Sequence, residues 1–305
     1  MTGRVVVVGD ALIDELRDDT GVREFVGGAA LNVAVGLGRL GVPTTLLAMV
    51  GDDEAGDHIR AYLHDFGVEL IATASPHGSS RAVSTRSAGG EPTYVFNDAA
   101  KARRIRFGEA ERTAIADAPL VAVSGFPFDD VAQTLEFTEA VRDAGTRLAI
   151  DPNPRAGMLS DRAEFVRGFE ALAAGAALVK VGEDDAHLLY GEELDGLRAR
   201  LVDLGVDAVL ATEGAAGATI EAGTDIVTHP ISSLPGRIVD TMGAGDAAFA
   251  AAIAGLLESA PQDADAWGEV LQRAMDVAAA TCRFEGALLR LPSAVEDIDL
   301  DAIGT

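Results

Sequence analysis

The chain has 305 residues, 48% of them apolar, which is enough for one large α/β domain with a substantial core. Its 49 acidic residues outnumber its 24 basic residues, giving a formal net charge of -25 at pH 7. This charge argues against a nucleic-acid partner, because phosphate backbones bind to basic surfaces.

Residue usage also indicates the compartment. The single cysteine, Cys282, cannot form an intrachain disulfide, which fits a reducing environment. The first residues lack the pattern of a signal peptide, and the longest apolar helical run, residues 247–257, is too short to cross a bilayer. We therefore expect a cytoplasmic protein without a membrane partner. Abundant acids with only two lysines suggest a salt-rich, halophilic cytosol, with lineage bias as the alternative.

The first predicted element is a buried strand formed by four valines, residues 5–8. Gly9 and Asp10 end this strand, and Asp14 follows shortly after it. Ligands of parallel sheets gather beyond the carboxyl ends of the strands, so Asp10 and Asp14 are placed to contact one. The alternative is that both are acids of a turn.

A helix is predicted next, because apolar residues recur with helical spacing over residues 30–40, after the glycine pair Gly27 and Gly28. Asn32 lies one turn into this helix, on a face otherwise built from Ala and Val. A polar amide in such a place needs a partner. Either a ligand hydroxyl or a backbone group could serve.

Residues 80–97 differ from their surroundings, since two β-prone segments joined by a glycine-rich turn predict a hairpin. Together with the stretch after Asp14, this hairpin could form a small β-lid built from about residues 11–26 and 78–100. Such a lid would exclude water from a site beneath it. A free edge of the lid could also pair with a second copy to give a homodimer.

The remainder alternates between short apolar segments and helical periods, the pattern of a mostly parallel sheet with helices on both faces. Strands are expected at residues 44–50, 68–73, 120–125, 147–151, 177–181, 208–212 and 217–221. Residues 51–56 are expected to form a turn and the start of a helix that runs to Phe66, and further helices are expected at residues 130–144, 161–173, 184–190 and 192–204. The last two strands could pair as a hairpin about Gly223. No linker divides the chain, so we expect one doubly wound α/β domain, residues 1–305.

Polar or glycine-rich segments follow three of these strands. Arg155 offers a planar fork to an oxygen-rich ligand, or else is a surface arginine on a rigid proline loop. The acidic residues 183–185 suggest Mg²⁺ held through water near phosphates, or an acid-rich helix cap. The glycine loop at residues 212–217 could approach a nucleotide.

The stretch from Asp240 to Phe249 opens a helix of small residues. Its two glycines leave backbone N–H groups unobstructed at the positive end of the helix dipole, which favours anion binding. Asp246, directly behind them, could take a proton from a hydroxyl that attacks a phosphate. One alternative is a first-turn acid that complements the dipole. The other is the dinucleotide fingerprint, which residues 243–248 match formally.

Taken together, these residues resemble the ribokinase-like (PfkB-type) carbohydrate kinases over almost the whole chain. The C-terminal signature of that family, D-T-x-G-A-G-D followed by Phe, appears at residues 240–249. Its N-terminal signature, a glycine pair followed by N-x-A and a closing L-G, appears at residues 27–41. The resemblance implies a ribokinase-like fold and an ATP-dependent kinase whose acceptor is a small carbohydrate.

The resemblance also implies roles for matching positions. Asp246 would be the catalytic base, and the N–H groups of Gly243, Ala244 and Gly245 would form an anion hole for the transferred phosphoryl group. The residues expected at the acceptor are Asp10, Asp14, Gly28, Asn32 and Arg155, the last at the acceptor or at the phosphates. The residues expected at ATP are Thr212, Gly214, Gly217, Ala279 and Cys282. Mg²⁺ would bridge the phosphates, with Asp185 holding it through water, and K⁺ would bind beside Asp240.

The sequence departs from the family pattern where Gly182 and Asp185 replace the Asn and Glu of an N-x-x-E motif. In detail it is most similar to fructokinases, so fructose is the expected acceptor. The main alternative is 2-keto-3-deoxygluconate kinase, although Asp14 would repel an acidic acceptor. Ribose and nucleosides are further alternatives. Outside the family, the alternatives are a nicotinamide-dependent oxidoreductase and a non-catalytic sugar-binding protein.

Overall fold

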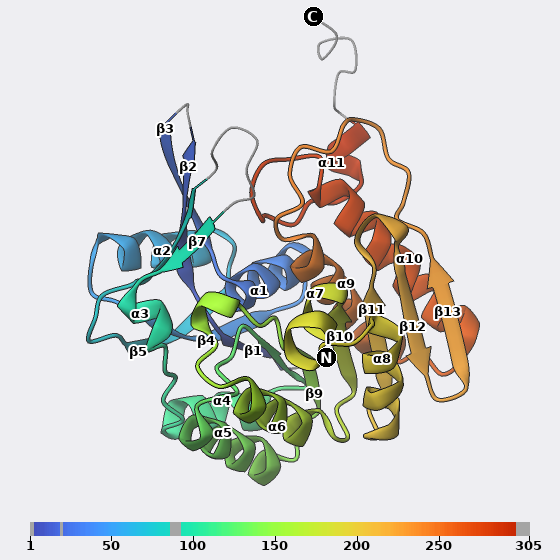
Figure 1. The fold of residues 1–305 in the computed structure, drawn as a ribbon, viewed down its shortest axis with the longest axis horizontal. Helices are drawn as coiled ribbons and strands as arrows, with labels where there is room; N and C mark the ends of the chain where they lie inside the picture. Colours follow the sequence, from blue (N-terminus) through green and yellow to red (C-terminus); the bar gives the residue numbers. More distant parts are fainter. Residues whose placement is uncertain (1–2, 19–20, 86–92, 297–305) are drawn as a thin grey trace, which may run out of the picture.

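The computed structural model describes residues 3–18, 21–85 and 93–296, and a large sheet lies at its centre (Figure 1). Among these residues, nine strands form this sheet in the order β13-β12-β11-β10-β9-β8-β1-β4-β5. Their bounds are β1 (Val5–Gly9), β4 (Thr44–Val50), β5 (Glu69–Ala74), β8 (Val121–Ser124), β9 (Leu148–Asp151), β10 (Leu178–Gly182), β11 (Ala208–Thr212), β12 (Ala218–Ala222) and β13 (Asp225–His229). Neighbouring strands are parallel from β5 to β11, whereas β12 and β13 are antiparallel. The predicted doubly wound, mostly parallel fold is confirmed.

The valines of β1 alternate between two hydrophobic cores, one on each face of the sheet. Val5 and Val7 belong to one core, and Val6 and Val8 belong to the other. The first core includes α1 (Ala29–Arg39), α2 (Glu54–Asp65), α9 (Ala244–Ser259) and α10 (Ala264–Thr281). The second includes α4 (Glu109–Asp117), α5 (Val131–Ala144), α6 (Arg162–Ala173) and α8 (Leu194–Asp203). Burial on both faces explains why this strand is an unbroken apolar run.

Helix α9 is apolar all round because it is enclosed by its neighbours. Every residue from Asp246 to Leu256 is buried, and both α1 and α10 pack against the helix. Small side chains permit this close approach, since a Cβ placed on Gly36 of α1 would lie 3.1 Å from Cβ of Ala250. The helix begins after Gly243, whose left-handed φ of 74° turns the chain into it, three residues earlier than expected.

A second sheet adjoins the carboxyl end of β1, and its strands have the order β3-β2-β6-β7 (Figure 1). Their bounds are β2 (Leu12–Asp18), β3 (Gly21–Gly27), β6 (Ser80–Thr85) and β7 (Thr93–Phe96). Strands β2 and β6 are parallel, and the other two pairs are antiparallel. These strands come from the two stretches assigned to the β-lid. The turn expected between β6 and β7 falls on residues 86–92, which lie outside the described residues.

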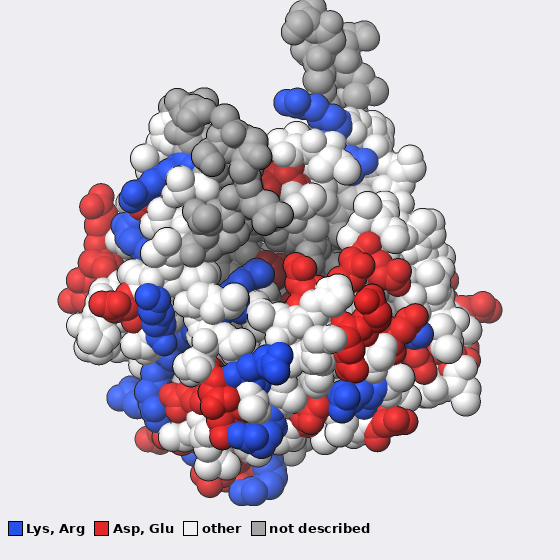
Figure 2. All heavy atoms as spheres, viewed as in Figure 1, with Lys and Arg blue, Asp and Glu red and all other residues white. Residues whose placement is uncertain are grey.

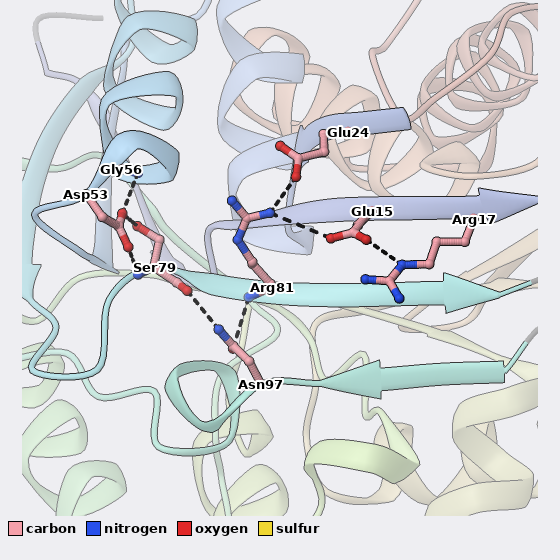
Figure 3. Close-up of polar contacts among 8 residues, drawn as sticks. All are labelled: Glu15, Arg17, Glu24, Asp53, Gly56, Ser79, Arg81 and Asn97. Carbon is pink, nitrogen blue, oxygen red and sulfur yellow. Dashed lines mark hydrogen bonds and ion pairs between the residues drawn. The ribbon is translucent and has the colours of Figure 1, made fainter. Parts of the chain in front are cut away.

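Side-chain hydrogen bonds fix the base of this second sheet (Figure 3). The Asp53 carboxylate caps α2 by accepting from the Gly56 N–H at 2.8 Å, and it also accepts from the N–H and hydroxyl of Ser79 at 2.8 and 2.6 Å. Asn97 accepts from the Arg81 N–H at 3.0 Å and donates to the Ser79 carbonyl at 3.0 Å. The start of β6 is therefore tied both to α2 and to the end of β7.

The hairpin near the C-terminal edge differs from the prediction. Strands β11 and β12 are antiparallel, as expected, but the segment at residues 213–217 joins them. Gly223, with a left-handed φ of 60°, instead joins β12 to β13, a strand that was not predicted. Strand β13 is five residues long and mixes polar and apolar side chains, so it lacks the continuous apolar run that marked the other strands.

Several short elements complete the described chain. These are α3 (Asp98–Lys101), η1 (Ala156–Met158), α7 (Glu183–Asp185), η2 (Ala186–Tyr190), η3 (Gly214–Ala216) and α11 (Ser293–Glu296). Helices α3 and α4 were not predicted. Among the described residues, the structure contains no helix with the length and apolar character needed to span a membrane.

Candidate active site

A large cavity of about 800 Å³ opens where the carboxyl ends of the central strands face the second sheet. The predicted site residues that line it are Asp10, Asp14, Gly28, Asn32, Arg155, Asp185, Thr212, Gly214, Asp240, Gly243, Gly245 and Asp246. The predicted residues that do not line it are Ala244, Gly217, Ala279 and Cys282. Figure 2 shows acidic side chains gathered beside this region, over α7 and α8. Residues far apart in the sequence thus line one cavity.

Two carboxylates from the first strands lie at the α1 end of the cavity. Oδ1 of Asp10 accepts from the Ala30 N–H at 3.1 Å, at the positive end of α1. Gly28 makes this contact possible, because its φ is 107° and a Cβ there would lie 2.8 Å from the Asp10 carbonyl oxygen. Burial raises the pKa of Asp10. Burial and then the charge of Asp10 raise the pKa of Asp14 to about 7.

Asp246 lies beside Asn32 in the same part of the cavity. Nδ2 of Asn32 donates a hydrogen bond of 2.8 Å to Oδ2 of Asp246, so the partner of this half-buried amide is a side chain. Burial raises the pKa of Asp246, and the hydrogen bond from Asn32 acts to lower it. A buried carboxylate with a raised pKa, oriented by one fixed donor, has the properties of a general base.

The turn before Asp246 brings two glycines to the cavity wall. Gly243 has a left-handed φ of 74°, and a Cβ there would lie 2.7 Å from Cβ of Ala287. The N–H of Ala244 donates to the Thr241 carbonyl at 3.3 Å, and Ala244 does not line the cavity. Gly243 and Gly245 do line it, at the positive end of α9, where a helix favours an anion.

The carboxylate of Asp240 holds this turn against the segment after α10. It accepts from the N–H of Met242 at 3.1 Å and from the N–H of Gly286 at 3.2 Å. The carbonyl of Cys282 in turn accepts from the N–H groups of Val239 and Asp240, at 2.8 and 3.3 Å. Cys282 therefore supports the turn through its backbone.

A buried lysine beside the turn was not among the predicted site residues. Nζ of Lys180 lies 3.2 Å from Oδ2 of Asp151, which is fully buried. A Cβ on Gly245 would be 3.3 Å from the same Nζ, so the ammonium group lies close to the anion-binding turn. Burial acts to lower the pKa of Lys180, but the carboxylates of Asp151, Asp185 and Asp246 outweigh it and raise the pKa. The sequence did carry a signal, a lysine inside the apolar strand Leu178–Gly182 of a chain with two lysines.

Arg155 reaches the cavity from the loop after β9. Asn153 in that loop has a left-handed φ of 41°, and Pro154 follows it. Arg155 is exposed, yet its charge acts to lower the pKa of Asp10, Asp14 and Asp246. It is thus a positive charge at the mouth of an acidic cavity.

The opposite end of the cavity is lined by Thr212 and Gly214. Gly217 supports this loop from behind, because its φ is 114° and a Cβ there would lie 2.1 Å from the His229 carbonyl oxygen. Ala279 is fully buried in α10, and Cys282 is buried at its end. Gly217, Ala279 and Cys282 are therefore buried and do not line the cavity.

The acidic segment at α7 is the part of the cavity that would contact a metal ion. Glu183, Asp184 and Asp185 line the cavity, and Oδ2 of Asp185 accepts from the Gly182 N–H at 2.7 Å. Within the described residues, no three His, Cys, Asp or Glu side chains converge as a metal cage. This donor set fits Mg²⁺ that is held mostly by phosphates and water, with a protein carboxylate in support.

Comparison with known proteins gives the chain clear relatives. Residues 2–294 match the family described as pfkB family carbohydrate kinase. A fructokinase from Rhizobium leguminosarum bv. trifolii is 30% identical over 263 residues, 83% of this chain and 79% of that protein. A 2-dehydro-3-deoxygluconokinase from Bacillus subtilis is 29% identical over 282 residues, 88% of this chain and 84% of that protein. The crystal structure of aminoimidazole riboside kinase from Salmonella enterica, complexed with aminoimidazole riboside and an ATP analog, has a TM-score of 0.78 and 25% identity, covering 96% of this chain and 99% of that one.

Proposed function

The chain belongs to the pfkB family of carbohydrate kinases, and we propose that it transfers the γ-phosphoryl group of ATP to a hydroxyl of fructose. The family match covers residues 2–294, so a nicotinamide-dependent oxidoreductase and a non-catalytic binding protein are set aside. Identity alone does not choose the acceptor, since a fructokinase at 30% and a 2-dehydro-3-deoxygluconokinase at 29% are nearly equal. The choice between the two acceptors therefore rests on the charged residues that line the cavity.

The observation that carries the fructose proposal is the carboxylate cluster at the α1 end. Asp10, Asp14 and Asp246 all line this end of the cavity. A neutral polyol can donate hydroxyl hydrogen bonds to such acceptors, whereas a carboxylate-bearing sugar would be repelled by them. The alternative acceptor, 2-keto-3-deoxygluconate, is favoured by Arg155, which could pair with its carboxylate. Ribose and nucleosides also lack a carboxylate, so they fit the carboxylate cluster as fructose does.

In the proposed reaction, Asp246 removes the proton of the acceptor hydroxyl. Asn32 occupies Oδ2 of Asp246, which leaves Oδ1 to receive that proton. The acceptor oxygen then forms a bond to the γ-phosphorus of ATP, while the bond from phosphorus to the β–γ bridging oxygen breaks and ADP leaves. A raised pKa suits Asp246 to this task, because it makes the carboxylate a stronger base than an exposed aspartate.

We propose that the turn at Gly243 and Gly245 stabilises the negative charge that develops on the transferred phosphoryl group. Gly243 and Gly245 line the cavity at the positive end of α9, and we propose that their N–H groups donate to the phosphoryl oxygens. The ammonium group of Lys180, beside Gly245, adds a full positive charge that the sequence signature does not include. We propose that Lys180 lowers the electrostatic cost of placing phosphates among these carboxylates.

Two cations belong to the same proposal. Mg²⁺ would neutralise phosphate charge, with Asp185 and its acidic neighbours at α7 as the supporting residues. The replacement of the family asparagine by Gly182 removes one oxygen ligand there. K⁺ would bind beside Asp240, each of whose carboxylate oxygens accepts one backbone N–H and retains a second lone pair.

The second sheet would act as the lid of this site. Leu12, Ala82 and Phe96 come from its strands and line the cavity above the carboxylates. Its outer strands carry Val22 and Val95, which are 60% and 63% exposed and would be covered if a second copy paired with the sheet. Sedimentation equilibrium tests this proposed homodimer, and a monomer at all concentrations would contradict it.

A panel of acceptors tests the function directly. Fructose, 2-keto-3-deoxygluconate, ribose and a nucleoside are each supplied with ATP, Mg²⁺ and either KCl or NaCl, and ADP formation is measured. We expect fructose to give the highest kcat/KM. A preference for 2-keto-3-deoxygluconate would contradict the acceptor but not the kinase. No ADP formation with any of the acceptors would contradict the proposed reaction.

A further inference from the structure

Two arginines meet in a half-buried site outside the active-site cavity. Arg39 is the last residue of α1, and Arg290 lies in the segment after α10. The two segments touch one turn earlier, where a Cβ on Gly36 would lie 3.1 Å from Cδ1 of Leu289. Neither arginine lines the active-site cavity.

Aromatic rings hold both guanidinium groups in place. The guanidinium carbon of Arg39 lies 5.7 Å from the ring centroid of Phe66, and that of Arg290 lies 4.6 Å from the centroid of Phe284. Tyr62 of α2 packs edge-on against Phe66, with the ring centroids 4.9 Å apart. The rings cover the faces of the guanidinium groups, so the N–H edges are the parts left for a ligand.

The positive charge of this cluster has no partner within the described chain. Nε of Arg39 and Nε of Arg290 are both buried without a hydrogen-bond acceptor. Neither arginine forms an ion pair with a carboxylate of residues 3–18, 21–85 or 93–296, although the sequence contains 49 acids. Burial, and then the nearby charge of Arg290, lower the pKa of Arg39. Two half-buried guanidinium groups are costly without an anion between them.

We propose that Arg39, Arg290 and Tyr62 form a binding site for an oxyanion, the phosphate or carboxylate group of a small molecule. Two guanidinium forks supply paired N–H donors with the planar geometry that oxyanions accept. The charges of Arg39 and Arg290 both act to lower the pKa of Tyr62, so its hydroxyl lies near them and adds a third donor. Partial burial strengthens each of these contacts. The site lies at the C-terminal end of α1, whereas the catalytic cavity receives Asn32 from its other end. This proposal does not depend on the acceptor of the kinase.

Calorimetric titration with inorganic phosphate tests the site, with the active site of the full-length enzyme kept filled by an unreactive ATP analogue and Mg²⁺. We expect Arg39→Gln and Arg290→Gln each to weaken phosphate binding by about tenfold or more, and Tyr62→Phe by a few-fold. Arg147→Gln, at an exposed arginine elsewhere, is the matched control and should bind as the wild type does. Equal affinity in all variants, or no binding of millimolar phosphate by the wild type, would overturn the proposal. Titrations with a hexose monophosphate and with citrate identify which source of oxyanion binds best.

A crystallographic measurement on the unmodified protein covers the case in which a variant fails to fold. Crystals of the wild type are soaked in selenate, an oxyanion with an anomalous signal. We expect an anomalous peak between Arg39 and Arg290. A peak at the Gly243–Gly245 turn with none at the arginine pair would contradict the site.

Discussion

Oδ2 of Asp246 accepts a hydrogen bond of 2.8 Å from Nδ2 of Asn32, although 214 positions separate the two residues in the sequence. Helices α1 and α9 pack side by side and hold the two side chains together. The orientation of the proposed base is therefore a property of helix packing. An error in that packing would disturb catalysis without touching the carboxylate itself.

Replacing the base isolates its chemical role. Asp246→Asn keeps the shape of the side chain but removes its ability to accept a proton at neutral pH, so we expect kcat to fall by about 10³-fold. Affinity for ATP should change little, because the N–H groups of the turn stay in place. Steady-state kinetics and calorimetric titration with ATP measure the two effects. Turnover within tenfold of the wild type would remove Asp246 from the mechanism.

Removing its partner should change the pH profile. The hydrogen bond from Asn32 acts to lower the pKa of Asp246, so Asn32→Ala should raise that pKa. Since the base must be deprotonated, the acidic limb of kcat/KM should move to higher pH by roughly one unit. The shift separates orientation of the base from simple loss of sugar contacts, which would raise KM and leave the limb where it was.

The two lysines of the chain provide a matched pair of variants. Lys180→Met removes the charge beside Gly245, and we expect kcat to fall by about 10²-fold. It also leaves the buried Asp151 carboxylate unpaired, at a cost of about 3 kcal/mol in the free energy of unfolding. Lys101→Met, at an exposed lysine, should affect neither quantity.

A double variant separates the two effects of Lys180. Lys180→Met with Asp151→Asn leaves no unpaired charge, so urea unfolding should show most of the stability restored. Turnover should stay low, because the ammonium group is still missing. Recovery of turnover along with stability would show that Lys180 serves only the fold.

Asp14 should make the stability of the free protein depend on pH. Burial, followed by the charge of Asp10, raises its pKa from 3.8 to about 7. Between about pH 4 and pH 7 the folded state keeps a proton that the unfolded state has lost, so this residue lowers stability as pH rises through that window. Asp14→Asn should therefore stabilise the protein at pH 8, by up to about 4 kcal/mol, while weakening fructose binding. Urea unfolding at pH 5 and pH 8 measures the effect, and a gain that does not grow with pH would contradict it.

Two glycines with similar backbone angles test the anion-binding turn. Gly243 and Gly223 have φ values of 74° and 60°, so alanine at either costs about 1 kcal/mol in backbone strain. At Gly223 no atom lies within 4 Å of the added Cβ, whereas at Gly243 it would press on Ala287. We expect Gly243→Ala to lower kcat at least tenfold and Gly223→Ala to leave it unchanged. Equal kinetics for the two variants would show that the turn tolerates displacement.

The sheet could be predicted from the sequence because its strands are buried on both faces. Runs such as residues 5–8 stand out from any surface segment. Strand β13 could not be found in this way, since it lies at an edge with alternating exposure and carries a mixed sequence. The turn at Gly223 was consequently assigned to the wrong pair of strands.

Side-chain partners were harder to predict than positions. The sequence marked Asn32 as a polar group in need of a partner, but only packing of α1 on α9 supplies Asp246 as that partner. Lys180 and Asp151 likewise come from neighbouring strands, and no local pattern links them. The resemblance implied that Gly217 contacts ATP together with Gly214, whereas in the structure Gly214 lines the cavity and Gly217 lies against the His229 carbonyl. The positions of glycines in a sequence cannot distinguish one that faces a ligand from one that avoids a carbonyl group.

The attachment of the second sheet through Asp53 has a mechanical consequence. One carboxylate clamps both the first turn of α2 and the beginning of β6, and Asn97 fastens β7 to the same spot. These hydrogen bonds lie along one short border of the sheet, so any movement of the sheet would be a rotation about that border. Displacement of the sheet would be smallest near Ser79 and would grow along β2 and β3, toward the tips farthest from the anchor.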